Sequence, residues 1–169
     1  MPEHDDHRVV LALGANLGDR LDTLNQALRL VAAAERCRIT AVSAVFETDP
    51  VGGPEQPPYL NAIALLSTDE SPHQLLRRCQ RIEVELGRQR LVRWGPRTVD
   101  LDLISIDDLR IDSDELILPH PRAASRAFVL VPWAEVDPTA ELAGAGPIAD
   151  LLEGMDRTGI SRVGHVRRS

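Results

Sequence analysis

Hydrophobic and polar residues follow two different rhythms along the chain, one typical of strands and one typical of helices. Val9–Leu13 is a short apolar run that predicts a buried strand. Asp19 stands where its side chain can cap a following helix, which we expect to end near Glu35. That helix is predicted by apolar residues that recur at helical spacing: Leu21, Leu24, Leu28 and Val31.

Three further strands and a second helix are predicted between residues 39 and 106. Ile39–Thr48 and Leu60–Thr68 are rich in apolar and β-branched residues, and each predicts a strand. Residues 71–74 (SPHQ) supply an N-cap serine and a capping-box glutamine, and Gly87 ends the helix that follows. Thr98–Ile106 predicts the last strand. The order βαββαβ predicts an α+β fold of the ferredoxin-like kind, with helices on one face of a mainly antiparallel sheet.

The chain of 169 residues is long enough for one domain with its own core. We expect a single domain over residues 1–169, with a flexible segment at 1–7. The C-terminal part adds to the βαββαβ core. Arg126–Glu135 predicts a short helix interrupted at Pro132, and Pro147–Leu152 predicts another.

The composition is that of an ordinary globular protein, with 43% hydrophobic and 27% charged residues. The net charge of −7 argues against a general nucleic-acid surface. Positive charge is nevertheless concentrated in residues 88–97, which hold four arginines and no acidic residue. Such a cluster in an acidic protein favours an anion site, although a solvated basic loop has the same composition.

Nothing in the sequence predicts secretion or membrane insertion. The N-terminal residues are polar and acidic, and no apolar stretch is long enough to span a bilayer. The two cysteines, Cys37 and Cys79, form no disulfide framework and lack metal-ligand spacing. We therefore expect a cytoplasmic monomer with reduced thiols and with neither a membrane nor a nucleic-acid partner.

Asp100 and Asp102 are two residues apart on the predicted strand Thr98–Ile106, so both side chains point to one face. Their Cα atoms lie roughly 6.5–7 Å apart in an extended chain. Two carboxylates this close repel each other unless a cation lies between them, and Mg²⁺ prefers carboxylate and phosphate oxygens. With the nearby arginines, which match phosphate oxygens, the pair favours metal-assisted phosphoryl-type transfer. A plain strand with polar residues turned outward is the alternative.

Two widespread nucleotide-binding motifs do not match. Residues 14–19 (GANLGD) lack the Lys-Ser/Thr ending of a P-loop, which excludes a P-loop kinase. Residues 81–87 (RIEVELG) resemble a Nudix box, but the arginine-to-glycine spacing is one residue short and the paired glutamates are absent.

Five stretches of the sequence together resemble one enzyme family. They are LALGANLGD (11–19), FETDPVGGPEQPPYLNA (46–62), RIEVELGR (81–88), RWGPRTVDLDL (93–103) and LPHPRAASRAFVLVPWAEVDP (118–138). In order and spacing they are similar to the 6-hydroxymethyl-7,8-dihydropterin pyrophosphokinases of folate biosynthesis. The resemblance implies that a diphosphate passes from ATP to the hydroxymethyl group of the reduced pterin, leaving AMP.

On the ATP side, the resemblance implies two Mg²⁺ ions between the ATP phosphates and the pair Asp100 and Asp102. Arg88 and Arg97 match the family's catalytic arginines, which also contact ATP. The other positions that the resemblance implies for ATP binding are Gln80, Glu83, Leu103, His120 and Arg126.

On the pterin side, the resemblance implies aromatic stacking together with a hydrogen-bonding amide. Asn61 matches the amide that reads the hydrogen-bonding edge of the pterin. Backbone groups near Thr48 and Val51 are expected to complete this recognition. The matching aromatic positions are Tyr59, Trp94 and Phe128.

The sequence also departs from the family pattern. Ala15 replaces the serine that is commonest there, and Asp49 stands where proline is common. Residues 88–94 are one residue shorter than in well-known members and contain no lysine. Two other functions stay open: a metal-dependent nucleotide hydrolase, and a non-catalytic module that binds a nucleotide or a pterin.

Overall fold

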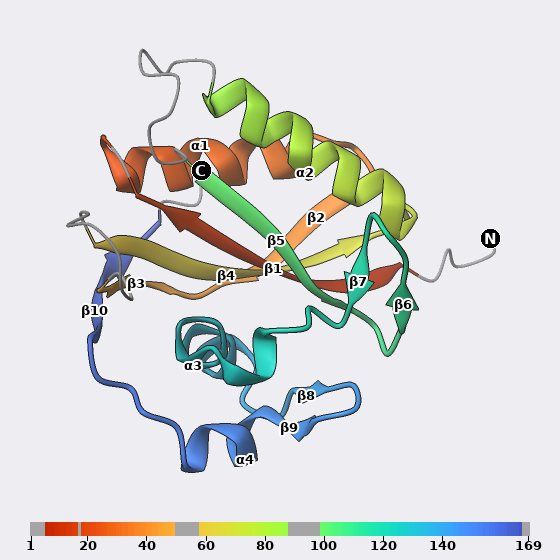
Figure 1. Ribbon diagram of the computed structural model, residues 1–169. Coiled ribbons are helices and arrows are strands. Elements are labelled where there is room, and N and C mark those ends of the chain that lie inside the picture. The colour runs from red at the N-terminus through yellow and green to blue at the C-terminus, as the bar shows by residue number, and fades with distance from the viewer. Residues whose placement is uncertain (1–5, 17, 50–57, 88–98, 167–169) are drawn as a thin grey trace.

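The computed structural model describes residues 6–16, 18–49, 58–87 and 99–166. A central sheet separates two layers of helices (Figure 1). The strands of that sheet are β1 (His7–Ala15), β2 (Cys37–Val42), β3 (Ala44–Thr48), β4 (Tyr59–Thr68), β5 (Val99–Ile106) and β10 (Ile160–His165). The helices are α1 (Arg20–Ala32), α2 (Pro72–Gly87), α3 (Ala127–Val136) and α4 (Ile148–Glu153), with a short 3₁₀ turn, η1, at Ala123–Ser125.

The described strands of the main sheet pair antiparallel, with strand order β10-β3-β4-β1-β5 and with β2 also paired to β4. Strand β4 therefore lies between β1 and the β2–β3 segment, and β1 lies between β4 and β5. This is the arrangement of two interleaved βαβ units, which confirms the predicted ferredoxin-like α+β fold. Two small hairpins lie outside the sheet: β6 (Ile111–Asp112) with β7 (Ile117–Leu118), and β8 (Glu141–Leu142) with β9 (Gly146–Pro147).

The predicted strand Ile39–Thr48 is two strands in the structure, β2 and β3, because the ladder is interrupted at Ser43. The buried Ser43 donates its backbone N–H to the Ile63 carbonyl at 2.8 Å. Its hydroxyl oxygen accepts from the Ile63 N–H at 2.9 Å. The serine hydroxyl thus takes the place of one backbone acceptor in the ladder. The alternation of hydrophobic residues in the sequence does not predict this interruption.

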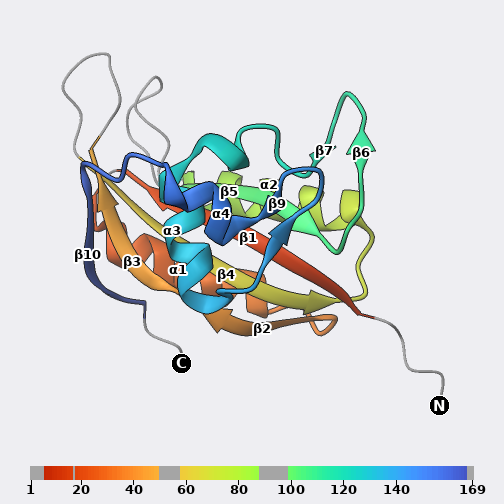
Figure 2. The same cartoon turned by 90° about the horizontal axis from the view of Figure 1, so that it is seen from below.

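The expectation of helices on one face describes only half of the molecule. Helices α1 and α2 cover one face, whereas α3 and α4 lie on the other (Figures 1 and 2). Helix α3 also runs through Pro132 without the predicted interruption. An internal proline costs a helix about 3 kcal/mol, and α3 offsets this cost by burying Val129, Leu130 and Trp133. Within the described ranges, no helix is long and apolar enough to cross a membrane.

Each face of the sheet has its own hydrophobic core. Leu11 and Leu13 of β1 pack in the core shared with α1 and α2, while Val10 faces the core shared with α3. Strand β5 carries one extra residue, Ile104, opposite the step from Val10 to Leu11. Because of this bulge Ile104 also packs on the α3 side. The sheet is thus buried on both faces near its middle.

The beginnings of helices α1 and α2 follow the sequence signals closely. The Asp19 carboxylate accepts the Asp22 N–H at 3.0 Å and caps α1. Ser71 and Gln74 form the predicted capping box, with reciprocal bonds of 3.0 and 3.2 Å. Helix α1 ends at Ala32, before the predicted Glu35.

The N-terminal strand begins earlier than the sequence predicts. Val9–Leu13 extends to β1, His7–Ala15, so His7 lies in the sheet although it was expected in a flexible segment. The reason is a contact distant in sequence: His7 Nδ1 lies 2.7 Å from Asp107 Oδ2, and the Arg8 N–H donates to the same carboxylate.

Arg78 on α2 forms a buried ion pair with Glu70 and also bonds to the end of α1. Arg78 on α2 donates two hydrogen bonds to the Glu70 carboxylate, at 2.8 and 2.9 Å. Its Nη1 also donates to the Val31 carbonyl near the end of α1, at 2.8 Å. The Thr68 hydroxyl donates to Glu70 as well, at 3.1 Å. Only 13% of the Arg78 side chain and 9% of the Glu70 side chain are exposed.

Candidate active site

The register of the sheet places two predicted site residues, Asp100 and Asn61, in one row with Gly14. On β1, Gly14 pairs with Asp100 of β5 on one side and with Asn61 of β4 on the other. Paired residues on neighbouring antiparallel strands point to the same face, so Asp100 and Asn61 flank a position with no side chain. Their Cα atoms are two strand spacings apart, roughly 10 Å. The next row on this face pairs Ala12 with Asp102.

This row forms the floor of a cavity of about 360 Å³ at the end of the sheet where β1 finishes. The cavity gathers predicted residues from β3, β4, β5 and the start of α3. Those that line it are Thr48, Tyr59, Asn61, Asp100, Asp102, Arg126 and Phe128. The predicted geometry of β5 is confirmed, because Val99, Leu101 and Leu103 point to the opposite face, into the core under α1 and α2.

The start of α3 covers the cavity on the side away from the sheet. Arg126 immediately precedes this helix, and Phe128 lies in its first turn. The guanidinium carbon of Arg126 is 5.3 Å from the centre of the Phe128 ring, a cation–π distance. The side chain of Arg126 thereby has a defined position at the cavity, which Asp100 and Asp102 also line.

The polar end of the cavity is organised around Asn61. Its side-chain amide donates to the Thr48 hydroxyl at 2.7 Å, and both residues are buried. A methyl group added at Gly14 would lie 3.2 Å from Asn61 Oδ1, closer than an ordinary contact. Glycine at this position therefore allows the amide to lie directly over the β1 backbone.

His120 is close enough to Asp102 for the Asp102 carboxylate to affect the pKa of its imidazole. Burial lowers the pKa of His120, and the positive charges of Arg126 and Arg122 lower it further, while the Asp102 carboxylate opposes them. The His120 N–H donates to the Ile104 carbonyl at 2.8 Å, so its backbone is tied to β5. The imidazole is therefore biased towards its neutral form.

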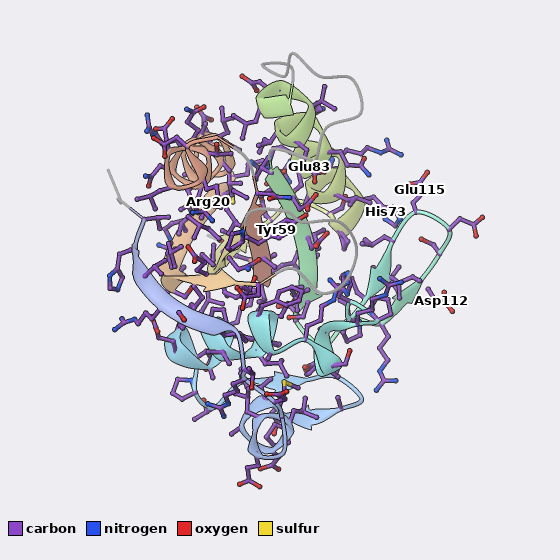
Figure 3. The ribbon with its side chains drawn as sticks, turned by 60° about the vertical axis from the view of Figure 1, so that its left-hand side comes forward. Arg20, Tyr59, His73, Glu83, Asp112 and Glu115 are labelled. Atoms are coloured by element: carbon purple, nitrogen blue, oxygen red, sulfur yellow. The ribbon has the colours of Figure 1, made fainter. Side chains whose placement is uncertain are left out.

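Three residues that the resemblance implies for ATP binding are not among those that line the cavity: Gln80 and Glu83 on α2, and Leu103 on β5. Glu83 accepts the Leu101 N–H at 3.1 Å, so its carboxylate contacts the β5 backbone between the two aspartates; Figure 3 shows Glu83 beside this strand. Gln80 is exposed on α2. Leu103 is 4% exposed in the core, so its side chain cannot reach a ligand in the cavity.

Four predicted site residues lie outside the described part of the chain: Val51, Arg88, Trp94 and Arg97. Conversely, the cavity is also lined by residues for which the sequence predicted no role there: Ala12, Leu13, Gly14, Asp49, Ala62 and Val129. Gly14 carries no chemical group, and its importance comes from its register between Asp100 and Asn61. Only knowledge of the strand pairing could have revealed it.

The donor set at Asp100 and Asp102 fits magnesium bound together with phosphate. Among the described residues, no group of three or more His, Cys, Asp or Glu side chains could hold a metal ion. A bound Mg²⁺ keeps several waters and is held by one or two carboxylates plus substrate phosphates. Two carboxylates on one face of β5 match that requirement.

Comparisons with known proteins identify the class of enzyme. A family model described as 7,8-dihydro-6-hydroxymethylpterin-pyrophosphokinase (HPPK) matches residues 10–138. A Bacillus subtilis 2-amino-4-hydroxy-6-hydroxymethyldihydropteridine pyrophosphokinase is 47% identical over 126 residues, 75% of each chain. The enzyme with the same description from Methylorubrum extorquens is 40% identical over 156 residues, 92% of this chain and 98% of the relative.

These matches, on this fold and with this cavity, define an ATP-dependent diphosphokinase. The chain belongs to the 7,8-dihydro-6-hydroxymethylpterin-pyrophosphokinase family. Its activity is pyrophosphate transfer from ATP to hydroxymethyldihydropterin in folate synthesis.

The fold is also that of a solved structure with little sequence similarity. A Plasmodium falciparum HPPK-DHPS chain superimposes with a TM-score of 0.68 at 13% identity, over 89% of this chain and 45% of that one. The chain thus spans less than half the length of that longer protein, and the likeness concerns the fold alone.

Proposed function

We propose that Asp100 and Asp102 hold two Mg²⁺ ions against the phosphates of ATP, with the pterin bound beside them between Asn61 and Phe128. The observation that carries this assignment is the row Asp100–Gly14–Asn61 across the sheet. It joins an acidic end and an amide end of one cavity, so the diphosphate donor and its acceptor can meet over Gly14. Magnesium in this position would neutralise phosphate charge and orient the ATP for transfer.

The cationic residues around the cavity are proposed to bind the triphosphate. Arg126 offers a permanently charged fork, and its contact with Phe128 limits its orientations. A neutral His120 can donate a hydrogen bond to a phosphate oxygen without adding to the positive charge. Arg88 and Arg97 are proposed to complete this set, as the resemblance implies. Catalysis would then consist mainly of positioning and charge stabilisation.

The pterin is proposed to lie against the aromatic and amide groups at the other end of the cavity. Tyr59 and Phe128 line the cavity from opposite layers, β4 and α3. A flat heterocycle between them would gain roughly 0.5–1.5 kcal/mol per ring pair beyond its buried area. Asn61 has an amide oxygen left to accept from the pterin while its NH₂ group donates to Thr48. Backbone groups near Thr48 and Val51, and the Trp94 ring, belong to the same proposal.

The other residues implied for ATP binding are Leu103, Gln80 and Glu83. Leu103 would contribute only through its backbone, since its side chain is in the core. Gln80 and Glu83 are proposed to reach the nucleotide from α2, and Glu83 additionally supports β5 through Leu101. We further propose that residues 1–169 act as one catalytic domain, as a cytoplasmic monomer whose partners are ATP and a reduced pterin. The net charge of −7 favours such small-molecule partners over nucleic acid.

The pterin assignment is tested by changing Asn61 and the glycine beside it. We expect Asn61→Leu to raise the KM for the pterin roughly 10- to 100-fold, because about 1–3 kcal/mol is lost when a buried polar partner is removed. Gly14→Ala should raise the same KM several-fold, since the new methyl would lie 3.2 Å from Asn61 Oδ1. The KM for ATP should change little in either variant. Steady-state kinetics with each substrate varied in turn measures these effects.

The matched control is Gly154→Ala, because a methyl group there meets nothing within 4 Å. It should leave both KM values unchanged. An unaltered pterin KM in Asn61→Leu would show that the pterin does not bind at this end of the cavity.

A further inference from the structure

Arg20, the first residue of α1, contacts β3 and the residue that precedes β4, next to the amide end of the cavity. Its Nη2 lies 3.5 Å from Glu47 Oε2 on β3. Its Nη1 donates a hydrogen bond to the backbone carbonyl of Pro58, the residue before β4. About a quarter of the Arg20 side chain is exposed (26%), so most of the group is covered by the rest of the protein. Figure 3 shows Arg20 at the same end of the sheet as Tyr59.

The two partners of Arg20 adjoin two residues that line the cavity. Glu47 precedes Thr48, and Pro58 precedes Tyr59; Thr48 and Tyr59 are themselves paired across β3 and β4. Thr48 is also paired with Ile160 of β10, whereas Tyr59 is the first residue of β4, where the ladder ends and few hydrogen bonds fix the chain. A bridge from α1 to both strand ends therefore limits how far Thr48 and Tyr59 can shift relative to the rest of the cavity.

We infer that Arg20 is a positioning residue for pterin binding, which fixes Thr48 and Tyr59 without touching the substrate. The inference rests on the proposed assignment of the pterin to this end of the cavity. The guanidinium suits the task because its planar fork can bond a carboxylate and a carbonyl at once, whereas a lysine ammonium acts as a point charge. Because the ion pair with Glu47 is partly solvated, it contributes little to global stability. The role is thus local geometry.

The test compares Arg20→Ala with Arg20→Lys, Glu47→Gln and Arg29→Ala. Arg29 is an exposed arginine in the last turn of the same helix and serves as the matched control. We expect Arg20→Ala to raise the KM for 6-hydroxymethyl-7,8-dihydropterin roughly tenfold, the effect of losing one hydrogen bond to a charged group. The KM for ATP and kcat should stay within about twofold. Arg20→Lys and Glu47→Gln each keep part of the bridge and should fall between wild type and Arg20→Ala.

Three outcomes would overturn the inference. The first is a pterin KM in Arg20→Ala equal to that of Arg29→Ala. The second is an equal rise of the pterin and ATP KM values together with a lower Tm, which would mark a general effect on folding. The third is full rescue by Arg20→Lys, which would show that charge alone suffices. An unaltered pterin KM in Asn61→Leu would instead contradict the proposed pterin site on which the inference rests, so the two failures are distinguishable.

Discussion

Replacing Asp100 or Asp102 by alanine is expected to reduce turnover by about 10³-fold or more. Metal-assisted charge stabilisation is worth several kcal/mol, and each 1.36 kcal/mol changes a rate about tenfold. Either substitution removes one of the two carboxylates on the cavity face of β5, while the core residues on the other face are untouched. The same account predicts that removing Mg²⁺ from the wild type with a chelator stops turnover, and that excess Mg²⁺ restores it.

The control for this prediction is Asp108→Ala, an exposed aspartate in the turn that follows β5. It should keep wild-type turnover and an unchanged dependence on Mg²⁺. Both active-site variants should retain the Tm of the wild type, since neither residue is in the core. Turnover within tenfold of the wild type in Asp100→Ala or Asp102→Ala would rule out the two-metal arrangement.

Replacing Arg78 by alanine is expected to destabilise the fold by about 3–5 kcal/mol, the usual cost of leaving one partner of a buried ion pair alone. The Glu70 carboxylate would lose two charged hydrogen bonds, and the Val31 carbonyl at the end of α1 would lose its donor. Urea unfolding followed by circular dichroism measures the change. The control is Arg36→Ala, which removes an exposed arginine from its neighbouring pair with Asp69 and should change stability little.

The ion pair between Arg78 and Glu70 also predicts how the stability of the fold changes with pH. Burial alone would raise the pKa of Glu70, but the hydrogen bonds and charge of Arg78, with the Thr68 hydroxyl, hold that pKa below its ordinary value. A depressed folded-state pKa means that this stabilisation is present above the unfolded pKa and is lost as the pH falls through the folded one. The wild type should therefore lose its advantage over Arg78→Ala under acid conditions. A stability difference that grows as the pH falls would contradict this assignment.

The order of the elements could be predicted because each one carries a local signal. The period of two along β5 placed Asp100 and Asp102 on one face, and the capping residues Asp19 and Ser71 marked where α1 and α2 begin. The place where each element packs on the sheet has no such local signal. The sequence of α3 is apolar nearly all round, so it does not indicate which face of the sheet the helix covers, and its Pro132 suggested a break that tertiary packing overcomes.

The parts of the candidate site that depend on a side-chain group could be predicted from the sequence. The parts that depend on how the strands pair could be predicted less well. The aspartates were predicted from residue type and spacing, and Asn61, Tyr59 and Phe128 were predicted from the family resemblance; all of them line the cavity. Gly14 was missed because its place in the site comes from its pairing with Asp100 on one strand and Asn61 on the other, which no local pattern in the sequence shows. Leu103 shows the opposite case: a position implied to contact ATP carries a side chain that the strand period directs into the core.

The central claim is that one cavity holds both ATP and the pterin and passes a diphosphate between them. Phosphorus NMR of the protein with ATP and Mg²⁺, with and without 6-hydroxymethyl-7,8-dihydropterin, tests it most directly. The account predicts that AMP and a pterin diphosphate ester appear together, and only when the pterin is present. Release of ADP or free phosphate without the pterin would instead indicate a nucleotide hydrolase, and an unchanged spectrum in both samples would indicate a protein that only binds its ligands.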